Sequence, residues 1–247
     1  MAIETPLKDY TRMKHLYKTL TIALLPFLAS CSQATTAATP VDTSAAATAA
    51  ATAVKTTSAK IPKAQRAFAE TPKDGQAIAI FAGGCFWCTE SDFEKLPGVI
   101  RAISGYTGGA VNNPDYKQVS YTETGHYEAV KVIFDPEQVS YRQLVDGFWK
   151  TIDPTDDRGQ FCDKGSSYRS AIFVTPEQRA DAQASKAEIV KNKPFVAEIV
   201  TPILDATTFY KAEAVHQNYY KTNSLKYKYY RNGCRRDQRL EQLWGAK

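Results

Sequence analysis

The sequence predicts an α+β fold in which helices pack on a mixed β-sheet. Apolar or alternating segments typical of strands occur at 76–82, 99–107, 126–134, 168–174 and 196–203. Helix-like segments separate most of them, but a loop alone joins 99–107 to 126–134. Because a doubly wound parallel sheet needs a crossover helix between its strands, the missing helix favours the mixed arrangement.

The first strand and the first helix are predicted to meet at a pair of cysteines. Residues 76–82 form a short apolar run that ends at two glycines, and helix-forming residues follow Cys85 as far as Pro97. Cys85 is therefore expected at the junction between a strand and a helix N-terminus.

The middle of the chain predicts two more strands and a capped helix. Residues 99–107 alternate and end at a glycine pair, and 112–115 has the composition of a turn. The clearest alternation lies at 126–134. Ser140 is the expected N-cap of a helix over 141–152, which has apolar residues at helical spacing.

The last third of the domain predicts a loop, two strands and two helices. The polar, turn-rich segment 153–164 is expected to be a loop before the strand at 168–174. Thr175 is the expected N-cap of a helix that has Pro176 as its first residue and runs to Asn192. A helix is also predicted over 209–221, beyond the strand at 196–203.

The composition is that of one globular domain of moderate size. The chain has 247 residues, of which 43% are hydrophobic and 23% are charged. The net charge is +5, but the basic clusters at 226–228 and 235–236 are short and partly offset by nearby acidic residues. We therefore expect no nucleic-acid partner, and we expect a monomer.

The N-terminal residues resemble a bacterial lipoprotein signal. A lysine-containing stretch precedes the apolar run at 20–29, which is too short to span a bilayer as a helix. The run leads into Leu-Ala-Ser-Cys ending at Cys31, which resembles the site where a lipid is attached. We predict a signal peptide over 1–30, a natural start at Met13 and lipidation of Cys31. A buried apolar helix that happens to end in cysteine is the alternative.

A flexible tether is predicted between the lipid anchor and the folded domain. Residues 32–60 are rich in alanine, threonine and serine and contain no aromatic residue, so they cannot bury a core. We assign 31–73 to the linker and 74–240 to the folded domain. Lipid attachment implies export to the periplasmic face of the cell envelope, an oxidising environment, and Ser32 favours the outer membrane.

Cys85 is the better candidate nucleophile of the two cysteines at 85–88. The thiolate is the reactive form, and the free N–H groups and macrodipole of a helix N-terminus stabilise it. Cys88 lies one turn further along, where that field is weaker and a sulfur is more often packed. The alternative is that both cysteines are only small buried apolar residues.

A zinc site and a disulfide exchanger are the competing interpretations of this Cys-x-x-Cys motif. Zinc needs a second pair of ligands, but Cys162 and Cys234 lie far apart and no histidine has ligand spacing, so we expect no metal. A thioredoxin-like exchanger would fit the position of the motif. It has little use for Phe86 and Trp87, however, which suit a small apolar pocket such as one for a methyl group.

Several ordered motifs resemble those of the methionine sulfoxide reductase A family. They are Gly-Cys-Phe-Trp at 84–87, Gly-Tyr-Thr-Gly-Gly at 105–109, Asn-Pro-Asp-Tyr at 113–116, Thr-Gly-His-Tyr-Glu at 124–128 and Gly-Ser-Ser-Tyr-Arg-Ser at 165–170. The resemblance implies a ferredoxin-like α/β plait core of that family's type. It also implies an enzyme that repairs oxidised proteins by reducing methionine S-sulfoxide, free or in proteins, so 74–240 would be the catalytic domain.

The resemblance also implies which residues form the site. They are Cys85 as the thiolate, Glu128 as the acid, Tyr116 and Tyr168 as hydroxyl donors, Asp163 as a further polar group, and Phe86 and Trp87 as the wall of a methyl pocket. A sulfoxide sulfur is a poor electrophile until its oxygen is protonated or hydrogen-bonded. Glu128 therefore needs a raised pKa, which an apolar pocket supplies. From the alternation alone, Glu128 could instead be a solvated strand residue.

The implied cycle leaves Cys85 as a sulfenic acid, which a second thiol converts to a disulfide. No cofactor is implied, because thioredoxin or another external dithiol then reduces that disulfide. Cys234 is favoured narrowly as the resolving cysteine over Cys88, and Cys162 is a third candidate. We expect Cys234→Ser to retain single-turnover reduction and to lose thioredoxin-linked turnover. A degenerate binding module and a disulfide exchanger remain the alternative functions.

Overall fold

A six-stranded mixed sheet forms the centre of the part of the chain that the structure describes. The structure is a computed structural model that describes residues 72–245, so the predicted signal peptide, Cys31 and nearly all of the linker lie outside the described residues. The strands are β1 (Ala77–Gly83), β2 (Val99–Thr107), β3 (Tyr127–Phe134), β6 (Ser170–Val174), β7 (Ile203–Asp205) and β8 (Tyr210–Lys211). A separate hairpin pairs β4 (Gly159–Gln160) with β5 (Asp163–Lys164).

The order of the strands confirms the predicted plait core. The strands run β7-β6-β1-β3-β2-β8 across the sheet. The four central strands are antiparallel to their neighbours, β8 continues that pattern at β2, and β7 pairs in parallel with β6. This mixture of parallel and antiparallel pairs is the predicted α+β arrangement. The expectation that a loop alone joins β2 to β3 is wrong, however, because the short helix α3 (Tyr116–Tyr121) lies between them.

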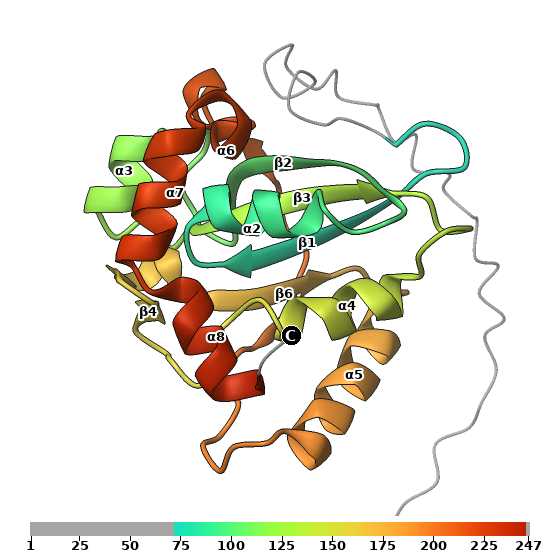
Figure 1. Cartoon of the computed structure of the whole chain (residues 1–247). Helices are drawn as coiled ribbons and strands as arrows, with labels where there is room; N and C mark the ends of the chain where they lie inside the picture. Colours follow the sequence, from blue (N-terminus) through green and yellow to red (C-terminus); the bar gives the residue numbers. More distant parts are fainter. Residues whose placement is uncertain (1–71, 246–247) are drawn as a thin grey trace, which may run out of the picture. The chain divides into compact units, whose positions relative to one another are not determined.

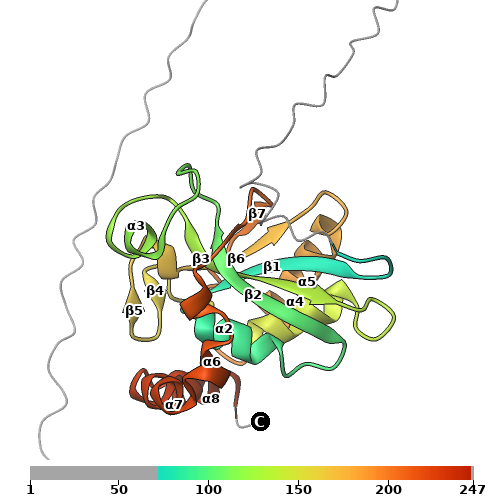
Figure 2. The same ribbon diagram turned by 90° about the horizontal axis from the view of Figure 1, so that it is seen from above.

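Helices cover one face of the sheet and one end of it (Figure 1). They are α2 (Phe86–Phe93), α3 (Tyr116–Tyr121), α4 (Tyr141–Trp149), α5 (Arg179–Asn192), α6 (Tyr219–Thr222), α7 (Ser224–Gly233) and α8 (Arg236–Trp244). In Figure 2, α2, α4 and α5 lie along the same side of the central strands. Within residues 72–245, no helix is both long and apolar enough to cross a membrane.

Both faces of the central strand β3 are buried. On the helix side, its Val130 and Val132 pack with Phe81 and with the aromatic residues of α2 and α4. On the other side, the chain around Phe209 closes over the sheet, and the ammonium of Lys131 lies 4.8 Å from the Phe209 ring centroid. The alternation of β3 therefore separates two buried faces, because loop segments cover the face that carries no helix.

The local signals for α2 and α4 are confirmed. Cys85 is the N-cap of α2, directly after β1. Ser140 caps α4 through a capping box: its hydroxyl accepts from Gln143 N–H, and the Gln143 side chain accepts from Ser140 N–H. α4 ends at Trp149, short of the expected end at residue 152.

The predicted start of α5 is wrong. α5 begins at Arg179, and residues 176–178 form a turn. The Gln178 side chain accepts a hydrogen bond from Thr175 N–H at 3.2 Å and donates one to the Ile78 carbonyl at 2.6 Å. Gln178 therefore ties the turn to β1, and Thr175 does not act as the N-cap.

The predicted strand at 196–203 is also wrong over most of its length. Val196 is 98% exposed, and the strand β7 begins only at Ile203. Its parallel pairing with β6 starts at the register Ile172↔Ile203, so the earlier residues lie beyond the end of the sheet.

The predicted helix at 209–221 is replaced by β8, a 3₁₀ turn at Ala214–His216 and the short α6. Tyr210 pairs with Tyr106 at the edge of β2, and Asn218 has a left-handed φ of 52°. The start of the segment therefore pairs with the edge of β2 as a strand, and the left-handed conformation of Asn218 prevents a continuous helix over the other residues. The helices α3, α7 and α8 and the small β4–β5 hairpin were not predicted.

Candidate active site

The predicted site residues come together at one end of the sheet. In both views α3, the β4–β5 hairpin and α7 lie around this end, close to the start of α2 (Figures 1 and 2). Cys85 lies at the start of α2, Glu128 in β3, Tyr116 at the start of α3, Asp163 in β5 and Tyr168 in the 3₁₀ turn Ser166–Tyr168. Segments distant in sequence thus converge on one cysteine.

A glycine at a left-handed position allows Cys85 to begin the helix. Gly84 has a φ of +79°, and a Cβ added there would lie 2.5 Å from the Cβ of Gln160. The Gln160 side chain is held in turn by hydrogen bonds with the backbone of Asp153. The Cys85 carbonyl accepts hydrogen bonds from Cys88 N–H at 3.1 Å and Thr89 N–H at 3.2 Å, which closes the first turn of α2.

The pKa values of the two cysteines in this pair are shifted in opposite directions. Burial raises the pKa of the Cys85 thiol well above its usual value, and the nearby Cys88, Glu128 and Asp163 raise it further. A hydrogen bond from Cys85 lowers the pKa of Cys88 to about 7 against the effect of burial, and two arginines contribute to the lowering.

Glu128 is a buried carboxyl with one oxygen uncommitted. Its side chain lies on the helix side of β3 and is 1% exposed, so the solvated-residue alternative is wrong. Phe86 N–H donates to Oε2 at 3.0 Å, whereas Oε1 has no hydrogen-bond partner among the described residues. Burial raises its pKa to about 8, and the charges of Asp163 and Cys88 raise it too. Glu128 is therefore mostly protonated at neutral pH.

The two predicted hydroxyl donors lie next to this carboxyl. Tyr116 is placed by its own N–H, which donates to Glu213 at 2.7 Å, and by the capping box of Asp115 at the start of α3. Burial raises the pKa of both Tyr116 and Tyr168, and the charge of Glu128 raises each further. Both phenols therefore keep their protons and can act as hydrogen-bond donors.

Asp163 is held by a residue that the sequence analysis missed. The Tyr230 hydroxyl, in α7, donates to the Asp163 carboxylate, and it also interacts with the Cys85 thiol. Burial raises the pKa of Asp163, and the Tyr230 hydrogen bond opposes that shift. Tyr230 lies one helical turn before Cys234. It follows Cys85 by 145 residues in the sequence, so no local pattern around Cys85 could identify it as a site residue.

The two aromatic residues after Cys85 have different surroundings. Phe86 is buried, with its ring centroid 6.3 Å from that of Tyr116 and 5.2 Å from that of His216. Trp87 is half-buried, stacks on Tyr219 at 3.8 Å, and donates from its indole N–H to His216 Nδ1 at 3.2 Å. His216, which the sequence analysis also missed, thus braces this aromatic wall.

The cysteines of the described part form one disulfide and one free pair. Cys162 and Cys234 are bonded, with 4.9 Å between their Cα atoms, while Cys85 and Cys88 are free and buried. The favoured candidate Cys234 is therefore paired with Cys162 in this structure and not with Cys85. The Asp163 carboxylate lies within 4.8 Å of both disulfide sulfurs, which as a disulfide offer no thiolate ligand for a metal ion.

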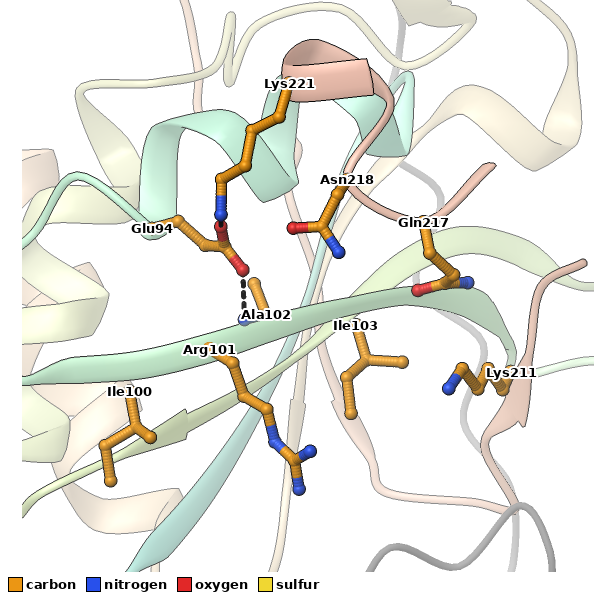
Figure 3. Close-up of a pocket in the computed structure, with 9 residues that line it drawn as sticks. All are labelled: Glu94, Ile100, Arg101, Ala102, Ile103, Lys211, Gln217, Asn218 and Lys221. Carbon is orange, nitrogen blue, oxygen red and sulfur yellow. Dashed lines mark hydrogen bonds and ion pairs between the residues drawn. The ribbon is translucent and has the colours of Figure 1, made fainter. Parts of the chain in front are cut away.

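Two other features near the motifs have structural explanations. His126 is 1% exposed, accepts from Gly109 N–H at 3.1 Å and contacts the Val111 carbonyl at 2.7 Å, so it holds the loop after β2. A polar pocket of about 370 Å³ lies between β2 and α6 and contains none of the predicted site residues (Figure 3). There Glu94 binds Lys221 and the backbone N–H of Ala102.

Comparison with known sequences gives consistent matches over the folded part. A family profile described as "Peptide methionine sulfoxide reductase" matches residues 77–247. Peptide methionine sulfoxide reductase MsrA 2 of Caulobacter vibrioides is 52% identical over 168 residues, which cover 68% of this chain and 85% of that protein. The MsrA protein of Bacillus subtilis is 48% identical over 171 residues, covering 69% of this chain and 97% of that protein.

Solved structures show the same fold. Methionine sulfoxide reductase A of Corynebacterium diphtheriae matches with a TM-score of 0.55 at 31% identity, over 62% of this chain and 77% of that one. The reduced form of Mxr1 from Saccharomyces cerevisiae matches with a TM-score of 0.59 at 28% identity, over 62% of this chain and 90% of that one.

Proposed function

Because the chain belongs to the peptide methionine sulfoxide reductase family, we propose that Cys85, Glu128 and the neighbouring tyrosines perform the family's reaction. The chain is an oxidoreductase that reduces methionine sulfoxide with thiols. The observation that carries the assignment of residues is the pairing of a buried, mostly protonated carboxyl with a cysteine at a helix start.

The reaction begins with activation of the sulfoxide oxygen. Glu128 holds a proton near neutral pH, and its Oε1 has no hydrogen-bond partner within residues 72–245, so it can donate to that oxygen. Tyr116 and Tyr168 can donate further hydrogen bonds from hydroxyls that stay protonated. Together these donors make the substrate sulfur electrophilic.

Cys85 then acts as the nucleophile on the activated sulfur. The sulfoxide S–O bond breaks, methionine leaves, and Cys85 becomes a sulfenic acid, so two electrons pass from Cys85 to the substrate. A second thiol of the chain condenses with the sulfenic acid and releases water. The electrons come from thiols throughout, and the proposed chemistry needs no metal or organic cofactor.

The aromatic wall beside Cys85 is proposed to bind the S-methyl group. Trp87 is half-buried and fixed by Tyr219 and His216, so it can present an apolar surface without a change of conformation. Phe86 is buried behind it. We propose methionine S-sulfoxide as the substrate, free or in oxidised proteins, because a site that contacts only the end of the side chain can accept both forms.

The proposed external partner is thioredoxin or another protein dithiol. Cys85 and Cys88 are buried, whereas Cys162 is exposed, so the Cys162–Cys234 disulfide is accessible to such a partner. The exported, lipid-anchored location and the monomeric state are proposals that rest on the sequence. A fatty-acid probe fed to cells should label the wild type and not Cys31→Ser; equal labelling of the two would refute lipidation.

Stoichiometric reduction of the two sulfoxide epimers tests the proposed function. Fully reduced wild type, without added reductant, should convert the S epimer to methionine and leave the R epimer unchanged. Cys85→Ser should convert neither. Reduction of the S epimer by Cys85→Ser, or no reduction by the wild type, would refute the assignment.

A further inference from the structure

Another pocket lies beside the candidate active site and contains none of the predicted site residues. It has a volume of about 640 Å³ and is lined by the loop 113–115, by residues 210–214 and by Gln217. We call it the flanking pocket. Its lining is mostly apolar, unlike that of the polar pocket in Figure 3, with which it shares Lys211 and Gln217. Hollows that are mostly apolar and carry a few polar groups are the usual form of a ligand site.

The flanking pocket borders the active site at Tyr116 and His216. Glu213 of the pocket accepts a hydrogen bond from Tyr116 N–H at 2.7 Å, and Asp115 of the pocket directly precedes Tyr116 in the chain. The ring centroids of Tyr116 and His216 lie 4.4 Å apart, and those of Tyr116 and Phe86 lie 6.3 Å apart. Tyr116 and His216 therefore connect the flanking pocket to the aromatic wall of the site.

An exposed apolar side chain lies next to both the pocket and the site. Val215 exposes 64% of its surface, and in the chain it lies between Ala214 of the pocket and His216 of the aromatic wall. Exposed apolar surface that adjoins an apolar pocket is typical of a region that a ligand covers. The apolar surface of the pocket therefore extends along this segment towards the site.

Hydrogen bonds hold the lining of the pocket in place. The Tyr210 hydroxyl donates to Asn112 Oδ1 at 3.1 Å, and Gln217 Nε2 donates to the Ala212 carbonyl at 2.9 Å. The capping box at Asp115 fixes the loop that precedes α3. The pocket is thus formed before any ligand binds, so binding there needs little ordering of the protein.

The charged groups that line the pocket are two carboxylates and one ammonium. Asp115 and Glu213 supply the carboxylates, and Lys211 supplies the ammonium. All three side chains are exposed or partly exposed, so their charges act through water. The pocket therefore favours an apolar occupant over an acidic one.

The geometry of a polypeptide places further side chains near the pocket when its methionine sulfoxide is bound in the site. Neighbouring Cα atoms are about 3.8 Å apart, so the residues on either side of methionine sulfoxide must lie beside the site. Free methionine sulfoxide has a carboxylate and an ammonium there instead, and it has no apolar group to place in the pocket.

Building on the function proposed above, we propose that the flanking pocket binds an apolar side chain next to methionine sulfoxide in an oxidised polypeptide. The site then prefers a polypeptide with an apolar neighbour over free methionine sulfoxide and over a polypeptide with an acidic neighbour. Pro114, Tyr210 and Ala214 are specificity-determining residues, because they contact the neighbouring residue and not the reacting sulfur.

Steady-state reduction of capped tripeptides tests this preference. Methionine S-sulfoxide is placed between two alanines, and leucine, glutamine or glutamate then replaces the alanine on one side or the other. Leucine on at least one side should raise kcat/KM at least about tenfold over alanine, because a single methylene in an apolar pocket is worth about that much. On the same side, glutamate should give a kcat/KM about fivefold below that of glutamine at low salt.

Ala214→Gln tests the position of the pocket. The longer polar side chain narrows the pocket, so the ratio of kcat/KM for the leucine peptide to that for the alanine peptide should fall at least about fivefold, towards one. Ala206→Gln is the matched control, because Ala206 is also exposed but follows β7, at the opposite edge of the sheet from β8. It should keep the wild-type ratio. Equal ratios in the two variants would overturn the assignment of the pocket.

Photo-cross-linking locates the neighbouring residue directly. The preferred peptide carries a diazirine analogue of leucine beside methionine sulfoxide and is irradiated with Cys85→Ser, which binds the substrate without reducing it. Mass spectrometry should place the cross-link within 113–115 or 210–214, and an excess of the peptide without the diazirine should abolish it. A cross-link only outside these residues would overturn the inference.

The outcomes separate this inference from the proposed function. If wild type reduces neither free methionine S-sulfoxide nor the alanine peptide, the proposed function fails, and the inference fails with it. If wild type reduces both and leucine raises kcat/KM on neither side, only the inference is overturned.

Discussion

Glu128→Gln isolates the acid of the proposed site. The amide has nearly the same size and can still accept the hydrogen bond from Phe86 N–H, which Oε2 of Glu128 accepts at 3.0 Å. It cannot supply the proton. With a pKa of about 8, roughly nine in ten Glu128 side chains are protonated at pH 7, so the change removes an acid that is present in most molecules.

The expected effect on the first turnover is large. A positioned general acid typically contributes about 10²- to 10⁴-fold to a rate, which corresponds to roughly 3 to 5 kcal/mol of barrier. Methionine formation by reduced enzyme, measured by rapid quench, should slow by that factor in Glu128→Gln. In wild type the rate should fall as pH rises through about 8, because the acid loses its proton there. This decline should be absent from the variant.

The raised pKa of Glu128 should also make the stability of the folded protein depend on pH. The pKa of Glu128 is higher in the folded protein than in the unfolded chain, because burial disfavours the charged carboxylate. The folded protein is therefore most stable at low pH, where Glu128 is neutral, and it loses stability as the pH rises towards 8. The loss at pH 7 is on the order of 3 kcal/mol. Thermal unfolding should show Glu128→Gln gaining stability over wild type between pH 5 and 8.

Glu90→Gln is the matched control for both measurements. Glu90 is also buried on α2 with a pKa raised to about 7 by burial, but it accepts hydrogen bonds from Ser104 and Asn218. Its replacement should alter the pH dependence of stability and leave methionine formation within a few-fold of wild type. A first-turnover rate for Glu128→Gln within tenfold of the Glu90→Gln rate would refute the role of Glu128.

Other changes probe the surroundings of the site. Cys162→Ser combined with Cys234→Ser opens a loop closed over a sequence separation of 72 residues, so denaturant unfolding should show a loss of about 4 kcal/mol; no loss would contradict a stabilising disulfide. Trp87→Ala should lower kcat/KM for free methionine sulfoxide at least about tenfold in a steady-state assay, and an unchanged value would exclude Trp87 from the pocket. Gly84→Ala should lower the free energy of unfolding by about 1 to 3 kcal/mol, because Gly84 has a φ of +79° and Gln160 lies close to it. An unchanged free energy of unfolding would refute that packing.

The elements with strong local signals could be predicted from the sequence. The strand β2 has the predicted bounds of Val99–Thr107, and Ser140 caps α4 with the hydrogen bonds that its spacing to Gln143 predicts. The position of Cys85 at the start of a helix followed from the glycines and the change of composition around it. In each case a few neighbouring residues determine the backbone conformation.

The elements that depend on distant partners could not be predicted in this way. Residues 209–221 have helical spacing, yet the edge of β2 captures Tyr210 as a short strand. The electrostatics of the cysteine pair depend on Arg231 and Arg236, which follow it by more than 140 residues. A sequence pattern around the two cysteines does not indicate such contacts, so the lowering of the Cys88 pKa could not be predicted from it.

The most direct test of the central claim is to identify the residue that is oxidised in the first turnover. Reduced enzyme with Cys88 replaced by Ser is given one equivalent of methionine S-sulfoxide and dimedone, and the labelled peptide is sequenced by mass spectrometry. We predict one methionine per enzyme and a single adduct on Cys85. An adduct on any other cysteine, or methionine formed with Cys85 unlabelled and still reduced, would contradict the claim that Cys85 is the nucleophile.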